Sequence, residues 1–153
     1  MIIISPYSKK LENGKMNPKN YPYWKELISL LLKSETIIQV GTIDEKQLVP
    51  DFRKNLKLKD LHELVKKCTF WISIDNFFHH MAHYIGKKGV VIWGPSDPDI
   101  FGYPENLNIL KDRNCLRKNQ FDIWEACQYD PNLFLNPEII FSKIKHLLTK
   151  KES

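Results

Sequence analysis

The stretch that decides the fold is ISIDNFFHHMAHYIGKKGVVIWGPSDP, residues 72–98. It reads as the end of a strand, a polar turn, a helix over 76–85, a strand over 89–93 and a second polar turn. Asp75 and Asn76 open the helix, and Gly94 begins the turn after the next strand. In open α/β sheets, ligands bind where the carboxyl ends of strands lead into such turns. We therefore expect both turns to lie at one functional edge of a sheet.

Strand and helix patterns alternate along the rest of the chain. Apolar, β-branched runs predict strands at 2–5, 36–40, 70–74 and 107–110, and either a strand or a loop at 52–56. Periodic apolar residues predict helices at 23–33, 58–68 and 137–148, while 114–131 reads as irregular or weakly helical. This alternation favours an α/β fold with a parallel sheet and helices on both faces. Because the chain has 153 residues, we expect residues 1–153 to form a single domain.

Composition narrows the class of protein. The net charge of +5 is compatible with an anionic ligand but identifies none. Arginine is scarce, which disfavours sequence-specific recognition of nucleic acid. No apolar run approaches the roughly 18 residues that a transmembrane segment needs. The cysteines form no CxxC pair and no secretory signal precedes them, so we expect reduced thiols in a cytoplasmic protein.

The turn at Asp75 and Asn76 has the features of an anion site. The first N–H groups of a helix have no partner within it, and they carry the positive end of the helix dipole. The lysine-rich loop over 6–20 would cross the same edge, and together they could hold a diphosphate. The alternative is that Asp75 and Asn76 only cap the helix and that residues 94–98 only shape a turn. Taken alone, the residues favour this structural interpretation of both turns.

The histidines of residues 76–85 invite a test for metal binding. His79 and His83 are four residues apart, so they could share one face of the helix. A zinc site needs further ligands, and position 80 is histidine, not the glutamate of an HExxH motif. We therefore expect no metal and no cofactor.

The turns and their flanking strands together resemble the heptosyltransferase-like glycosyltransferases of family 9, which have GT-B architecture. In that family a strand runs into Asp-Ser/Thr-Gly-x-x-His, and the next strand ends on Gly-Pro-Thr-Asp-Pro. Here DNFFHH at 75–80 and GPSDP at 94–98 match these motifs, with His80 on the family's histidine. Residues 5–6, 19–22 and 40–41 resemble the family's Ser-Pro loop, Lys-x-Trp-Pro and glycine-rich turn. The resemblance covers roughly residues 1–148.

The resemblance implies a Rossmann-like, single GT-B half-domain: the C-terminal half, which binds the nucleotide-diphosphate sugar donor. By position, Lys19 would meet a phosphate, and the backbone at Asn76 and Phe77 would cradle the diphosphate. Residues 41–44 would lie near the base or the ribose. The residues expected to bind the donor or its phosphates are Ser5, Lys19, Gly41, Asp44, Asp75, Asn76, Phe77, His80, Gly94, Ser96 and Asp97.

Two departures from the family bear on function. Phe77 replaces the family's glycine, which alters the amide cradle. The N-terminal half, which in the family carries the acceptor site and the usual catalytic acid, has no counterpart here. The catalytic residues are therefore unknown, with Asp97 and His80 as candidates for a base.

Three functions remain open. The favoured one is a glycosyltransferase whose other half comes from a partner chain or from a second copy in a homo-oligomer. The second is a module that binds a nucleotide or nucleotide sugar without converting it. The third is an interaction subunit with a vestigial site, in which Phe77 fills the former phosphate niche.

Overall fold

In the computed structural model, which describes residues 1–149, the core is a six-stranded sheet whose strands all run parallel. Residues 150–153, the end of the predicted single domain, lie outside the described residues. The strand order is β3-β2-β1-β4-β5-β6. The strands are β1 Ile2–Ser5, β2 Ile37–Gly41, β3 Phe52–Lys54, β4 Phe70–Ile74, β5 Val90–Ile92 and β6 Leu107–Ile109. The predicted parallel α/β fold is confirmed, and the order reverses between β1 and β4.

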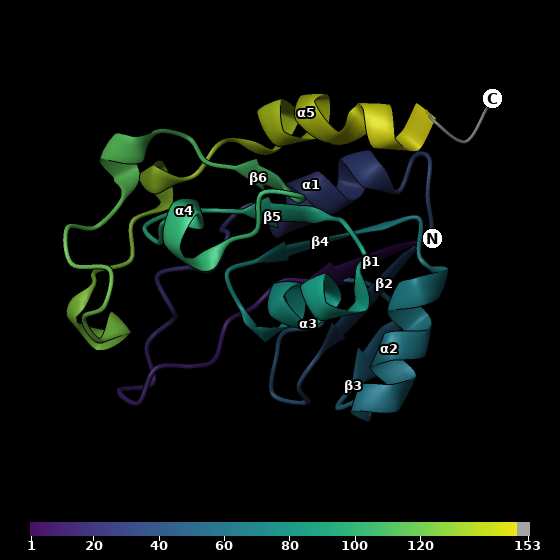
Figure 1. Cartoon of the computed structure of the whole chain (residues 1–153), viewed down its shortest axis with the longest axis horizontal. Coiled ribbons are helices and arrows are strands. Elements are labelled where there is room, and N and C mark those ends of the chain that lie inside the picture. The colour runs from purple at the N-terminus through teal and green to yellow at the C-terminus, as the bar shows by residue number, and fades with distance from the viewer. Residues whose placement is uncertain (150–153) are drawn as a thin grey trace.

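Helices cover both faces of the sheet, as the sequence predicted (Figure 1). The helices are α1 Trp24–Leu31, α2 Leu58–Lys67, α3 Phe77–Ile85, α4 Pro98–Phe101 and α5 Pro137–Thr149. Helices α1 and α5 pack together on one face, and α2 and α3 pack together on the other (Figure 1). Side chains of a strand alternate between faces, so β1 contributes to both cores. Ile2 and Ile4 pack with α1 and α5, whereas Ile3 packs with Trp71 and the helices opposite.

The strand–turn–helix unit from β4 to α3 follows from local residue chemistry. All five residues of β4 are buried, which suits a β-branched and aromatic run inside a parallel sheet. Asn76 is the N-cap of α3, because its side chain accepts a hydrogen bond from the N–H of Phe78. Gly86 ends the helix in the left-handed conformation, with φ of 80°. The helix is therefore fixed at both ends, and its N-terminus lies at the carboxyl end of β4.

The sequence was least informative between β5 and α5. Helix α4 was not predicted, and it forms because Asp97 caps it and Pro98 occupies its first position. The stretch expected to be irregular contains 3₁₀ turns at 113–115, 124–126 and 131–133. Among residues 1–149, no helix combines the length and apolarity that crossing a membrane demands.

Candidate functional site

An open cleft of about 1750 Å³ lies at the carboxyl ends of β1, β2 and β4. Its walls come from the loop after β1, the turn after β2, the start of α3 and residues 123–129. Because the strand order reverses between β1 and β4, the cleft occupies the switch point at which open α/β sheets bind ligands. The predicted residues that line it are Ser5, Lys19, Gly41, Asp44, Asp75, Asn76, Phe77 and His80.

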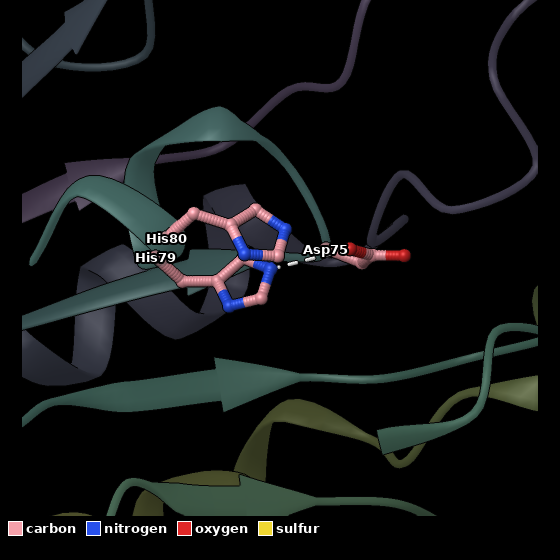
Figure 2. Close-up of side chains that lie close together, drawn as sticks. All are labelled: Asp75, His79 and His80. Carbon is pink, nitrogen blue, oxygen red and sulfur yellow. Dashed lines mark hydrogen bonds and ion pairs between the residues drawn. The ribbon is translucent and has the colours of Figure 1, made fainter. Parts of the chain in front are cut away.

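Asp75, at the end of β4, is the buried charge at the base of this cleft. It is 7% exposed, and its carboxylate lies between a lysine and a histidine. Oδ2 is 3.7 Å from the Lys19 ammonium. Oδ1 is 3.2 Å from Nε2 of His79 (Figure 2). Burial alone would raise the pKa of Asp75, but the His79 hydrogen bond and the Lys19 charge together hold it below its usual value. Asp75 is therefore ionised at neutral pH.

Asn76 ties the end of β1 to the start of α3. Its side-chain amide donates to the backbone oxygen of Ser5 at 3.2 Å, to the Ser5 hydroxyl at 3.0 Å and to the backbone oxygen of Tyr7 at 3.2 Å. Its own oxygen accepts from the N–H of Phe78 at 3.0 Å. The side chain is thus fully used in holding two cleft walls together, which leaves the backbone of the turn to meet a ligand.

Phe77 does not block the turn. The residue is 66% exposed at the margin of the cleft, so its side chain fills no buried niche at the turn. The structure therefore does not show the turn plugged by Phe77, which is the observation that would have favoured a vestigial site.

The histidines of α3 are distributed differently from the sequence expectation. His79 is fully buried, and its ring centroid lies 4.0 Å from that of His80. Burial lowers the pKa of His80, and its Nδ1 is 2.7 Å from the Tyr103 hydroxyl. His83 stacks on Tyr103 at 3.7 Å and pairs with Glu105 outside the cleft. His79 and His83 therefore do not share a site, whereas His79, His80 and Asp75 do.

The turn after β2 contains a functional candidate that the sequence analysis missed. Glu45 folds back onto Gly41 so closely that a Cβ at position 41 would lie 1.7 Å from Oε2 of Glu45. That oxygen is buried and has no hydrogen-bond partner among the described residues. Burial raises the pKa of Glu45 to about 7. Asp44, the residue chosen from sequence, is exposed and accepts a hydrogen bond from the Thr42 hydroxyl.

The predicted residues of the GPSDP turn lie beside the cleft and do not line it. Gly94 packs under Phe134, since a Cβ there would come within 2.4 Å of its ring. Asp97 caps α4 and forms an ion pair with Arg113 at 2.9 Å. Ser96 is buried, and its hydroxyl has no hydrogen-bond partner among the described residues. Of the two candidate bases, only His80 reaches the cleft.

Trp124 forms part of another wall of the cleft. Its ring lies 5.4 Å from the Lys19 ammonium and 3.5 Å from the Arg117 guanidinium. The segment around it is fastened to the loop after β1: Oε1 of Glu125 accepts from the N–H of Glu12, and the Tyr129 hydroxyl donates to the backbone of Asn20. No short sequence motif marked this segment as part of the site.

Searches against family models and against curated protein sequences found no match. Solved structures do match, and they define the class of fold: a Rossmann-like half-domain of GT-B architecture. Escherichia coli ADP-heptose LPS heptosyltransferase II matches with a TM-score of 0.70 and 18% identity over 100% of this chain and 47% of that one. E. coli heptosyltransferase WaaC, solved with ADP, matches with a TM-score of 0.69 and 16% identity, over 95% of this chain and 43% of that one. A glycosyl transferase of family 9 from Veillonella parvula matches with a TM-score of 0.68 and 15% identity, over 98% of this chain and 46% of that one.

The chain thus spans less than half the length of these glycosyltransferases. At such low identity the similarity establishes the fold. The expected likeness to one half of the heptosyltransferase-like enzymes is therefore confirmed for the architecture.

Proposed function

We propose that this chain binds the nucleotide-diphosphate part of an activated sugar and serves as the donor-binding half of a glycosyltransferase. The observation that carries the proposal is the convergence of Lys19 and the N-terminus of α3 on Asp75, inside a cleft at the switch point of the sheet. A diphosphate would draw the Lys19 ammonium away from Asp75, and His79 would remain to stabilise that carboxylate. The helix N-terminus would supply N–H donors to the phosphate oxygens.

The turn after β2 suits the nucleoside. In dinucleotide-binding folds of this strand order, an acidic side chain beyond the first βα unit accepts hydrogen bonds from ribose hydroxyls. Glu45 lines the cleft, with its unpartnered Oε2 buried against Gly41, and the exposed Asp44 lies next to it. Two of the similar structures are named for ADP-heptose or were solved with ADP, so ADP and ADP-sugars are the first ligands to test.

Transfer requires a second wall that positions an acceptor and excludes water. We propose that a partner chain or a second copy of this chain supplies it. His80 is the candidate base, because it lines the cleft and burial keeps its imidazole neutral.

A second candidate function is capture of the nucleotide sugar without conversion. The lack of a complete set of catalytic residues favours it. Of the two candidate bases, His80 and Asp97, only His80 lines the cleft among the described residues.

Calorimetry with ADP, AMP and ADP-sugars tests the proposal. We expect ADP to bind more tightly than AMP, and Lys19→Met to weaken ADP binding by roughly tenfold, as expected for loss of a charge-assisted contact. Lys33→Met, outside the cleft, is the matched control and should bind like the unaltered protein. If no nucleotide binds, both candidate functions fail. Release of ADP from an ADP-sugar supports the transferase, whereas recovery of the bound sugar intact supports the capture module.

A further inference from the structure

Three metal-ligating side chains meet where β4 leads into α3, and we call them the Asp75–His79–His80 cluster (Figure 2). One carboxylate oxygen of Asp75 and one ring nitrogen of each histidine all lie within 4.8 Å of one another. Asp75 and His79 are buried, and His80 is partly exposed along the cleft. Within residues 1–149 no other group of three such side chains is gathered this closely.

We propose that the Asp75–His79–His80 cluster binds one divalent transition-metal ion, with Zn²⁺ as the first candidate. Two imidazoles and one carboxylate are a donor set that zinc and non-haem iron use in proteins. Metal–ligand bonds of about 2.0–2.2 Å place neighbouring ligand atoms about 3.0–3.5 Å apart. Oδ1 of Asp75 and Nε2 of His79 are 3.2 Å apart, which already meets that spacing. The ligand atoms of the cluster lie within 4.8 Å of one another, so the partly exposed His80 ring would have to shift to reach bonding distance. As a metal ligand, His80 would no longer serve as the base proposed above.

The surroundings hold the ligands in orientation. The Tyr103 hydroxyl bonds Nδ1 of His80, which leaves the other ring nitrogen for an ion. The Ser8 hydroxyl donates to the backbone oxygen of Asp75 at 2.6 Å and fixes the residue at the end of its strand. Nδ1 of His79 has no hydrogen-bond partner among the described residues. The ring proton can therefore sit on Nδ1, which leaves Nε2 free to bind an ion.

The cluster leaves room for an exogenous ligand. Because two of its members are buried and the third lines the cleft, an open coordination position would face the cleft, as at catalytic zinc sites. The Lys19 ammonium, 3.7 Å from Oδ2 of Asp75, opposes a second cation. Replacing Lys19 by Met should therefore strengthen metal binding, the opposite of its expected effect on ADP binding.

Titration of metal-stripped protein with Co²⁺ in a buffer free of nucleotide and phosphate tests the site. We expect visible d–d absorption that saturates at one Co²⁺ per chain and is abolished by Zn²⁺. His80→Gln should weaken Co²⁺ binding by about tenfold or more. His83→Gln is the matched control on the same helix, since His83 pairs with Glu105 outside the cluster, and it should bind Co²⁺ like the unaltered protein.

Two results would overturn the proposal: no Co²⁺ absorption together with no Zn²⁺ binding by calorimetry, or unchanged Co²⁺ affinity in His80→Gln. His80 is partly exposed, so its variant is expected to fold, and circular dichroism verifies this. The buried His79→Asn serves only as a supporting variant. Because no nucleotide is present, failure of metal binding and failure of ADP binding are separate outcomes.

Discussion

Replacement of Asn76 tests whether the turn between β4 and α3 is held in place by one side chain. Asn76→Ala removes the N-cap of α3, a loss of about 1 kcal/mol. It also removes the donor that two backbone oxygens share, at Ser5 and Tyr7, and each such hydrogen bond contributes about 1 kcal/mol. We expect the free energy of unfolding to fall by about 2–3 kcal/mol, and the melting temperature by roughly 5–10 °C.

Urea unfolding followed by circular dichroism measures this loss, and Asn76→Asp is the matched comparison. The aspartate keeps the oxygen that accepts from Phe78, but it has no N–H to donate and adds a negative charge beside Asp75. At neutral pH we expect Asn76→Asp to be at least as destabilised as Asn76→Ala. If either variant unfolds within about 0.5 kcal/mol of the unaltered protein, the side chain does not hold the two walls together and the reasoning fails.

Three further perturbations probe the core, the ionisation of the cleft and the limits of the site. Gly89→Ala should lower the free energy of unfolding by about 1–3 kcal/mol in urea unfolding, because a Cβ there would come within 2.2 Å of the buried Trp71 ring. Because burial raises the pKa of Glu45 from 4.5 to about 7, the folded state holds this proton more tightly than the unfolded state. The stability that this carboxyl contributes is complete below pH 4.5 and is lost as the pH rises to 7. Above pH 7, thermal unfolding should therefore show Glu45→Gln to be more stable than the unaltered protein by about 1 kcal/mol. Below pH 4.5 the variant should lose that advantage. Asp97→Asn removes the charge that pairs with Arg113 but leaves the cleft intact. ADP affinity measured by calorimetry should therefore stay within about twofold of that of the unaltered protein. A larger loss of affinity would place Asp97 in the site.

The sheet could be predicted from sequence because its strands are buried on both faces. Such strands read as continuous apolar runs, as residues 2–5 and 70–74 do, and the helices between them force parallel pairing. The turn at Asp75 and Asn76 was predictable for a different reason, because helix capping depends on residues adjacent in sequence.

Features that depend on tertiary packing could not be predicted. The GPSDP turn resembled a ligand loop, but packing of Gly94 under Phe134 directs it beside the cleft. Asp44 and Glu45 are chemically alike in sequence, and only the fold buries Glu45 against Gly41. Asp75 and His79 are four residues apart and could have been paired from helical spacing, but the sequence analysis paired His79 with His83 instead. His80 is the direct neighbour of His79, and only the fold brings its ring to the same cluster.

The fastening of residues 123–129 to the loop after β1 has a consequence for engineering and divergence. Glu125 and Tyr129 meet partners that precede them by more than 100 residues, yet none of the four belongs to the sheet. Loop grafting between residues 113 and 134 would thus re-shape one wall of the cleft while the strands beneath keep their register. Related chains could therefore differ in the shape of the cleft through this one segment, without any change in the sheet.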